Sequence, residues 1–330
     1  MVESSTPLLS VHDLKVHFKV KGDNAWPWTP ARMLKAVDGV SFHIQAGETL
    51  GIVGESGCGK STLARGVLNL VPATSGSVRW MGNELTGNDT GAWHSVRRDV
   101  QMIFQDPLAS LNPRMTIAQI IAEPLRTHFL SMPKDEIMAK VVEMMQRVGL
   151  NQQQINRYPH EFSGGQCQRI GIARALILQP KLVICDEPVS ALDVSIQAQI
   201  INLLKDLQQS MSLALIFIAH DLAVVKHISN RIMVMYLGRA VEKAEKTTLY
   251  AQPQHPYTKA LLSAIPIPDP RLERAKTIEL LTGDLPSPLN PPSGCAFRTR
   301  CPVAQLQCAA QTPVLHKVVA NSTEAACLLV

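Results

Sequence analysis

The sequence lacks any apolar run that is long enough to cross a bilayer. Its residues include no stretch of ~18 consecutive apolar residues, the length at which a membrane-spanning helix becomes the expected interpretation. Its first ten residues also lack a basic segment followed by an apolar core, so we expect no secretory signal. A chain that itself spans a membrane is therefore not expected.

The chain also carries little excess charge of either sign. A net charge of +5 over 330 residues is small beside the basic balance of nucleic-acid-binding domains, so no nucleic-acid partner is expected. Contents of 46% hydrophobic and 18% charged residues are typical of a packed globular protein. The length exceeds what one hydrophobic core usually serves, which predicts a main domain and a smaller one.

The most informative stretch is a glycine-rich loop between an expected strand at 49–53 and an expected helix at 63–68. It fits G-x-x-x-x-G-K-[ST], the phosphate-binding loop, in the strand–loop–helix context that this motif requires. Lys60 is expected to reach the β- and γ-phosphates, and the Ser61 hydroxyl to bind Mg²⁺. The predicted nucleotide-binding residues of this loop are Gly54, Glu55, Ser56, Gly57, Cys58, Gly59, Lys60, Ser61 and Thr62.

Hydrophobic periodicity predicts an α/β domain. Strands that alternate with helices favour a largely parallel sheet with ligand loops at its carboxyl edge. Within residues 106–178 helical spacing dominates, which predicts a helical subdomain that Pro124 and Pro133 break into short helices. The expected strands cover residues 8–20, 36–44, 77–80, 100–104, 182–185, 213–219, 231–237 and 239–242, and the later helices cover 167–178 and 196–210.

A change of composition divides the chain near residue 265. Residues 1–265 carry the strand and helix patterns, whereas residues 266–330 are rich in proline and hold four cysteines. This second segment has no sustained periodicity and little apolar material of its own. We therefore predict a main α/β domain at 1–265 and a small extension at 266–330.

Three aromatic positions allow two interpretations each. Phe18 lies near the end of the first expected strand, where its ring either stacks on a purine or belongs to the core. Trp26 and Trp28 lie in an irregular stretch rich in Asp, Asn and Pro, which predicts a loop. These tryptophans either anchor that loop or contact a partner or bilayer surface.

Polar side chains follow several of the expected strands at the point where each strand ends. Asp186 ends a buried strand, where its carboxylate can hold the water shell of Mg²⁺, and Glu187 can polarise the attacking water. Gln105 and His220 also follow strands, so they are expected at the same sheet edge. The amide of Gln105 can contact metal or water, and the imidazole of His220 can reach the γ-phosphate. Hydrolysis of a phosphate anhydride needs the phosphate charge to be neutralised and a water molecule to be aimed in line, and these groups can do both.

These residues together resemble the nucleotide-binding subunits of ABC transporters over roughly residues 8–265. The match rests on the phosphate loop, Gln105, the signature Ser163-Gly164-Gly165-Gln166, Asp186-Glu187, Ser190–Asp193 and His220. The resemblance implies an ABC-type P-loop NTPase fold that binds ATP and Mg²⁺, with Ser61, Gln105 and Asp186 at the metal. It also implies a head-to-tail dimer in which Ser163, Gly164, Gly165, Gln166 and Asp193 serve nucleotide binding, with Phe18 at the adenine-stacking position.

A closer resemblance is to the ATPases of bacterial oligopeptide/dipeptide importers. It rests on three stretches: Gln105-Asp-Pro-Leu-Ala-Ser-Leu-Asn-Pro113, His255-Pro-Tyr-Thr258, and Leu285 to Cys295. This resemblance implies an ATPase for oligopeptide import at the cytoplasmic face of the bacterial inner membrane. It further implies a second, non-identical ATPase, two transmembrane permeases and, indirectly, a peptide-binding protein. Dipeptide and nickel are the alternative cargoes.

The tail cysteines Cys295, Cys301, Cys308 and Cys327 also need an explanation. Their spacing, C-x5-C-x6-C-x18-C, is neither a zinc-ribbon pattern nor a ferredoxin run. A tail poor in apolar residues is expected to need a cross-link to stabilise its fold, and four thiolates bound to one metal centre would supply it. The resemblance implies a [4Fe–4S] cluster; free thiols, zinc or adventitious disulfides are the alternatives.

Two rival functions fit the sequence less well than that of a transporter ATPase. Soluble ABC-type ATPases that act on nucleic acid or ribosomes usually carry two cassettes or long coiled coils, but this chain has one cassette and no heptads. A non-hydrolysing regulatory subunit is not favoured because Asp186, Glu187, His220 and the signature are all intact.

Overall fold

Two compact units make up the chain. The first combines residues 1–43, 50–86 and 220–330, and the second combines residues 44–49 and 87–219. Trp26 and Trp28 lie outside the residues that the structure describes. The computed structural model describes residues 6–21, 31–87, 90–266, 269–276, 281, 283–318 and 323–330.

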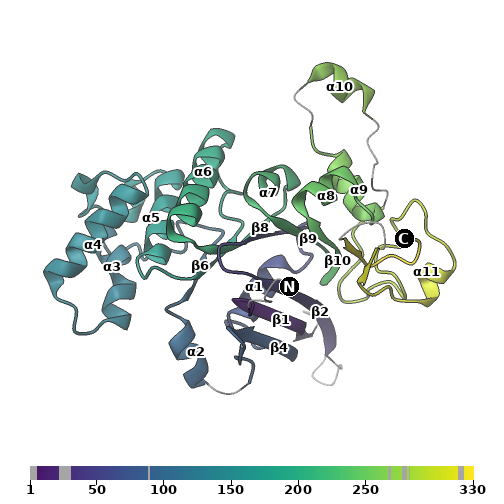
Figure 1. Ribbon diagram of the computed structural model, residues 1–330, viewed down its shortest axis with the longest axis horizontal. Coiled ribbons are helices and arrows are strands. Elements are labelled where there is room, and N and C mark those ends of the chain that lie inside the picture. The colour runs from purple at the N-terminus through teal and green to yellow at the C-terminus, as the bar shows by residue number, and fades with distance from the viewer. Residues whose placement is uncertain are drawn as a thin grey trace, which may run out of the picture. The chain divides into compact units, whose positions relative to one another are not determined.

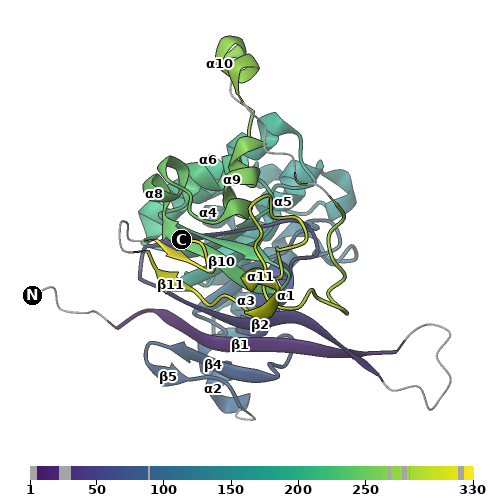
Figure 2. The same cartoon turned by 90° about the vertical axis from the view of Figure 1, so that its right-hand side faces the viewer.

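A four-stranded sheet in the first unit has the order β2-β1-β4-β5 (Figure 2). In β1, Val11 and Leu14 are both buried, although strict alternation would place them on opposite faces. The pairing of β1 with β4 shifts register between His12 and Lys15, and Asp13 lies between them at φ 46°. This bulge restores the buried face after one extra residue. The strands are β1 (Leu9–Val20), β2 (Arg32–Ile44), β4 (Ser75–Trp80) and β5 (Asn83–Glu84).

The other strands of the first unit follow the order β11-β12-β10-β9-β3. β3 and β9 are parallel, whereas β9, β10, β12 and β11 pair antiparallel. The last residues of the chain therefore add strands to the edge of β10. The strands are β3 (Thr49–Val53), β9 (Arg231–Tyr236), β10 (Arg239–Glu245), β11 (His316–Lys317) and β12 (Glu324–Ala325).

Short helices complete the first unit, and most of them were not expected from the periodicity. α1 follows the glycine-rich loop, and its Gly66 packs so closely on β1 that a Cβ would lie 2.9 Å from Val16. The described helices are α1 (Lys60–Val67), α7 (Leu222–Ile228), α8 (Lys246–Ala251), α9 (Pro256–Ser263), α10 (Pro270–Ala275) and α11 (Gln307–Ala310).

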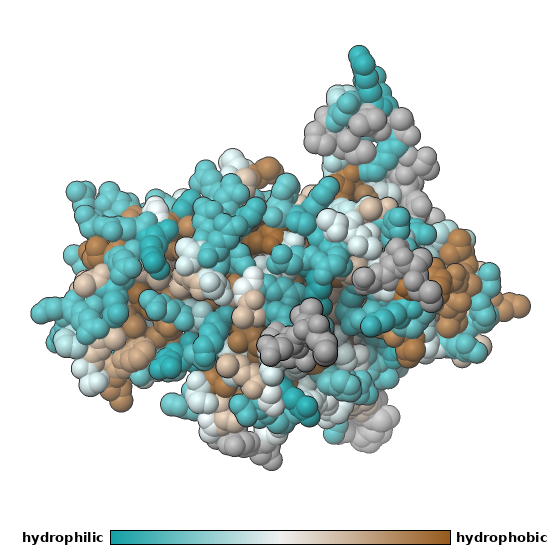
Figure 3. Space-filling model, in the orientation of Figure 1, coloured by the Kyte–Doolittle hydropathy of each residue, from teal (hydrophilic) through white to brown (hydrophobic). Residues whose placement is uncertain are grey.

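The C-terminal extension shares a core with the rest of the first unit. Phe297 is 1% exposed, and its ring lies 5.2 Å from that of Tyr236 and 5.4 Å from that of Tyr257. Because the extension has few apolar residues, burying this one aromatic ring against the domain is its main hydrophobic anchor. Other apolar residues of the extension, Leu306 and Val314 among them, remain exposed, and Figure 3 shows apolar residues gathered over this part of the chain.

The second unit has a parallel sheet in the order β8-β7-β6, with neighbouring helices. All residues of β7 and β8 are buried, as expected for parallel strands covered on both faces. Helices α3, α4 and α5 pack on one another (Figure 1). The elements are α2 (Thr90–Val96), β6 (Val100–Ile103), α3 (Ile117–His128), α4 (Lys134–Arg147), α5 (Gly164–Leu176), β7 (Leu182–Asp186), α6 (Val194–Met211) and β8 (Ala214–Ala219), with short 3₁₀ turns at Gln152–Gln154 and Pro159–Glu161.

Pro124 does not end a helix. It lies inside α3, so the prediction that it breaks the run is wrong, whereas Pro133 is the N-cap of α4, as expected. An internal proline removes one hydrogen bond and crowds the preceding turn. The buried residues of α3, including Ile120, Ile121 and Leu125, and a capping box at Thr116 compensate for this cost. Tertiary packing therefore overrides the local preference.

In the described part of the chain, no helix has the length and apolarity needed to span a membrane.

A buried histidine makes the stability of the first unit depend on pH. His255 is the N-cap of α9, and its Nδ1 accepts the backbone N–H of Tyr257 at 3.1 Å. Burial lowers the pKa of His255 from 6.5 to about 4. Between these two values the unfolded chain binds a proton that the folded chain does not, so stability rises with pH across this window and is independent of this group above it.

We expect the free energy of unfolding to fall by at most about 1.4 kcal/mol per pH unit as pH is lowered from 6.5 towards 4 because of His255. His255→Asn keeps a capping acceptor but cannot titrate in this range, so it should flatten the slope. Urea denaturation of both proteins at several pH values measures the difference. An unchanged slope in the variant would assign the pH dependence to other groups.

Candidate functional site

The glycine-rich loop connects β3 to α1 in the first unit and packs against neighbouring backbone. Gly59, the N-cap of α1, has φ 101°, and a Cβ at this position would lie 2.1 Å from the carbonyl oxygen of Ala36. Gly238 donates its N–H to the carbonyl of Cys58 at 2.8 Å. The β9–β10 turn and β2 therefore fix the path of the loop, which only glycine can follow at residue 59.

Lys60 is held over the loop that precedes it. It is only 4% exposed, and its Nζ donates to the carbonyl oxygens of Gly54 at 2.7 Å and Glu55 at 3.1 Å. The ammonium group of Lys60 therefore lies on the concave side of the loop, where it donates to these two carbonyl oxygens. The same curve presents backbone N–H groups and the N-terminus of α1, a combination that binds phosphate.

The cysteines near these motifs are buried thiols. Cys58 is fully buried, and burial raises its pKa although Lys60 opposes the shift. Burial likewise raises the pKa of Cys167 and, most strongly, of Cys185. A thiol with a raised pKa is a poor nucleophile. The geometry thus favours the interpretation of all three as small packing residues.

The second unit brings two of the predicted catalytic residues together. The Nε2 of Gln105 donates to the Oε2 of Glu187 at 3.0 Å. Glu187 follows β7 at φ 46°, and its backbone N–H donates to the carbonyl of Ile218 on β8 at 3.1 Å. Asp186, the last residue of β7, is 1% exposed. The edge of the sheet therefore holds the Glu187 backbone while the Gln105 amide orients its carboxylate.

The signature residues begin helix α5. Ser163 and Gln166 form a capping box, in which the Ser163 hydroxyl accepts the Gln166 N–H and the Gln166 side chain accepts the Ser163 N–H. Gly165 packs so closely on α6 that a Cβ would lie 2.6 Å from Cγ2 of Ile196. Asp193 is the N-cap residue of α6. The signature residues therefore lie beside the start of α6, where Asp193 is the N-cap.

His220 and Phe18 belong to the first unit. His220 is exposed directly after β8, and Asp221 beside it caps α7 by accepting the N–H of Ala223 at 2.7 Å. Phe18 is partly exposed in β1, next to His17, which contacts Asp38 at 3.1 Å. Their predicted roles at the γ-phosphate and the adenine remain predictions.

The four cysteines of the extension come close together, but not as a metal site. Cys295 donates its N–H to the carbonyl of Cys308 at 2.7 Å. Burial raises the pKa of Cys295, and the nearby thiols of Cys308, Cys301 and Cys327 raise it further. All are free cysteines. Across the described ranges, no group of three or more His, Cys, Asp or Glu side chains is arranged to hold a metal ion, so the structure does not support the iron–sulfur or zinc alternatives.

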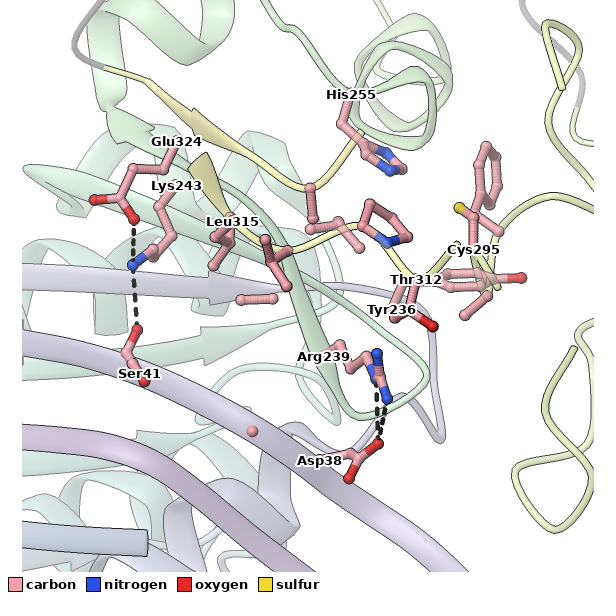
Figure 4. Close-up of a pocket in the computed structure, with 18 of the residues that line it drawn as sticks. Asp38, Ser41, Tyr236, Arg239, Lys243, His255, Cys295, Thr312, Leu315 and Glu324 are labelled. Carbon is pink, nitrogen blue, oxygen red and sulfur yellow. Dashed lines mark hydrogen bonds and ion pairs between the residues drawn. The ribbon is translucent and has the colours of Figure 1, made fainter. Parts of the chain in front are cut away.

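The structure also shows contacts of the extension that the sequence analysis does not assign. A cavity of about 640 Å³ lies between the extension and strands β1, β2, β9 and β10 (Figure 4). Across it Arg239 binds Asp38 at 2.6 Å, and Lys243 binds Glu324 at 2.8 Å. Its charged side chains are thus partly neutralised by one another. The rings around Phe297 close one side of the cavity.

A second group of unassigned contacts reaches the glycine-rich loop. The hydroxyl of Tyr257 accepts the N–H of Glu55 at 3.0 Å, and Arg300 binds the Glu55 carboxylate at 2.8 Å. The sequence held one usable signal, because His255 followed by Pro256 is an N-cap followed by proline at the first helical position. Nothing in the pattern pointed to Arg300.

Comparison with known proteins decides the family. A family model described as "ABC transporter" matches residues 37–190, and one described as "Oligopeptide/dipeptide transporter, C-terminal region" matches residues 241–308. The chain is 65% identical, over 96% of its length and 95% of the relative's, to the oligopeptide transport ATP-binding protein OppF of Escherichia coli. The chain belongs to the ATP-binding subunits of the ABC transporters. The OppF protein of Haemophilus influenzae is 61% identical over 98% of this chain and 97% of its own.

Solved structures of ABC cassettes share the fold. The dimeric ATP-binding cassette MJ0796, bound to ADP and Pi after hydrolysis, superposes with a TM-score of 0.64 at 27% identity, covering 72% of this chain and 98% of its own. The predicted ABC-type α/β fold and the resemblance to peptide-importer ATPases are therefore confirmed. The second family model spans Tyr257, Phe297 and Arg300, so the residues that anchor the extension lie inside a region typical of this family.

The close approach of α5 to α6 predicts which signature glycine tolerates a methyl group. We expect Gly165→Ala to lower the free energy of unfolding by about 1–3 kcal/mol, because its Cβ would collide with Ile196. Gly164→Ala is the matched control, since its Cβ would meet Leu192 at an ordinary 3.5 Å.

Urea denaturation of the single variants and of Gly165→Ala combined with Ile196→Ala measures this effect. Removing the colliding methyl should reduce the cost of Gly165→Ala. Both glycines lie in the first turn of α5, so helix propensity affects the two substitutions alike. Equal losses at the two glycines would rule out the contact with Ile196 as the cause.

Proposed function

We propose that this chain is the ATP-hydrolysing subunit that energises oligopeptide import by an ABC transporter. The observation that carries the proposal is the 65% identity to an oligopeptide transport ATP-binding protein over 96% of the chain. The phosphate loop around Lys60 and the contact between Gln105 and Glu187 supply the chemistry that such a subunit needs. The nucleic-acid or ribosome alternative has no comparable support.

We further propose which residues of each unit serve the nucleotide. The loop at 54–59 and Lys60 bind the phosphates, and Ser61, Gln105 and Asp186 have the oxygen donors that Mg²⁺ prefers. The metal supplies neutralisation of phosphate charge when bound. Glu187 polarises the attacking water, and the amide of Gln105 holds its carboxylate in position at 3.0 Å. His220 is proposed to contact the γ-phosphate.

Partners are proposed from the relatives. The signature residues Ser163 to Gln166 and Asp193 would serve the nucleotide of a second, homologous ATPase subunit, as head-to-tail dimerisation of this family implies. Two permeases in the bacterial inner membrane would receive the motion at the cytoplasmic face, with a peptide-binding protein delivering cargo. The alternative cargoes dipeptide and nickel are not favoured, because the relatives at 65% and 61% identity are oligopeptide transport ATP-binding proteins.

A [4Fe–4S] cluster at Cys295, Cys301, Cys308 and Cys327 remains a prediction of the family resemblance. Ligation requires thiolates, whereas burial raises the pKa of Cys295 and Cys301, so metal binding would have to release their protons. Anaerobic purification followed by visible absorption and iron analysis tests it. A brown protein that loses its colour and iron on Cys308→Ser supports the cluster; an iron-free, colourless protein refutes it.

Two substitutions separate nucleotide binding from hydrolysis. We expect Glu187→Gln to keep ATP affinity but to lower phosphate release at least ~100-fold, because the attacking water loses its base. Lys60→Ala should weaken ATP binding itself, because the loop loses its ammonium group. Phosphate release by the assembled transporter and ATP binding by each variant give the two readouts. Wild-type hydrolysis in Glu187→Gln would remove this residue from its role.

A further inference from the structure

The extension places one cation directly on the phosphate loop. Nη1 of Arg300 lies 2.8 Å from one carboxylate oxygen of Glu55 and 3.1 Å from the other. The Arg300 side chain is 9% exposed and that of Glu55 is 25% exposed. This pair is therefore shielded from solvent, unlike a surface ion pair, which contributes little.

Both ends of Glu55 are held by residues from the family's C-terminal region. Its backbone N–H donates to the hydroxyl of Tyr257 at 3.0 Å, while Arg300 holds its carboxylate. Glu55 lies within the predicted nucleotide-binding loop, and its own carbonyl accepts from Lys60 at 3.1 Å. A displacement of Glu55 would thus move an acceptor of the lysine that serves the phosphates.

Arg300 is itself held in place by the buried anchor of the extension. Its backbone N–H donates to the carbonyl of Phe297 at 3.0 Å, and Phe297 packs on Tyr236 and Tyr257. An arginine side chain stays protonated in proteins, and both oxygens of the Glu55 carboxylate lie against this one. The guanidinium therefore stays charged, and its position beside the Glu55 carboxylate is fixed by the packing of Phe297.

A carboxylate in a loop that binds a triphosphate opposes its ligand. Glu55 carries the same sign of charge as the phosphates, and like charges at short range repel more strongly where solvent is excluded. Arg300 supplies the missing opposite charge from outside the loop. Removing it would leave a partly buried, uncompensated carboxylate beside the phosphate chain.

We propose that Arg300 is a positioning residue for nucleotide binding, through which the C-terminal extension neutralises and orients Glu55 of the phosphate loop. This inference rests on the proposed ATPase function and adds a role for the extension within it. Arg300 acts through Glu55 and has no contact with the reacting atoms. The pair therefore sets affinity for ATP, and the hydrolytic step through Glu187 is unaffected once ATP is saturating.

The first test compares two arginines of the same extension. Arg300→Leu in the full-length chain should raise the dissociation constant of a fluorescent ATP analogue with Mg²⁺ about tenfold, in line with the loss of a charged hydrogen-bond partner. Arg298→Leu is the matched control: the Arg298 guanidinium donates to the carbonyl oxygen of Ser293 at 2.8 Å and to its hydroxyl at 3.3 Å, so its loss should leave the affinity unchanged. In the assembled transporter Arg300→Leu should raise KM for ATP and leave kcat near wild type.

The second test separates charge neutralisation from loss of packing. If Arg300 acts by compensating Glu55, then Arg300→Leu should cost about threefold or less when made in a Glu55→Gln background, because no carboxylate remains to be compensated. Arg300→Lys should recover part of the affinity. A variant that merely loosens the extension would cost the same in both backgrounds, and thermal melts of each variant identify such loosening.

The outcomes discriminate between this inference and the proposed function. A wild-type chain that does not bind the ATP analogue overturns both. A wild-type chain that binds, together with an Arg300→Leu variant of equal affinity, overturns the role of Arg300 alone. An equal loss in the wild-type and Glu55→Gln backgrounds also overturns it, since the loss would then be independent of the carboxylate.

Discussion

The packing of Phe297 against Tyr236 and Tyr257 is the contact on which the first unit depends. Tyr236 ends β9, and the turn that follows it donates the Gly238 N–H to Cys58 of the phosphate loop. Tyr257 lies in the first turn of α9, and its hydroxyl accepts the N–H of Glu55. One aromatic group therefore connects the extension to two separate supports of the loop, by burying apolar surface that the extension cannot bury by itself.

Backbone geometry, rather than side-chain contacts alone, organises the sheet edge that carries Glu187 in the second unit. The carbonyl oxygen of Ile218 on the neighbouring strand β8 accepts the N–H of Glu187. This bond holds Glu187 in a left-handed conformation that residues other than glycine rarely adopt. The Gln105 amide then needs only one hydrogen bond to orient the carboxylate. Strain held in place by a surrounding sheet is typical of functional positions.

The sequence was sufficient for features that depend on short-range patterns. Buried strands and the phosphate loop followed from runs of apolar residues and from glycine spacing, because these signals are local. The prediction that Pro124 ends a helix was wrong, because the burial of α3 outweighs the local cost of an internal proline. Helices α7 to α9 were missed because they are short and depend on caps such as His255.

Contacts between distant residues could not be derived from any such pattern. Arg300 and Glu55 are separated by 245 positions, and no periodicity links them. The pairing of β12 with β10 likewise joins two-residue segments that are too short to carry a strand signal. The metal expectation for the tail cysteines rested on resemblance, and the arrangement of their side chains does not by itself reproduce it.

The pairing of β12 with β10 bears on how this chain can be shortened. A protein cut near residue 265 would leave one side of β10 without a partner and would uncover the rings of Tyr236 and Tyr257. An unprotected strand beside bare aromatic surface invites other chains to add themselves. The extension thus also protects the domain from self-association. A shortened cassette without it would tend to aggregate, whether or not its nucleotide site were intact.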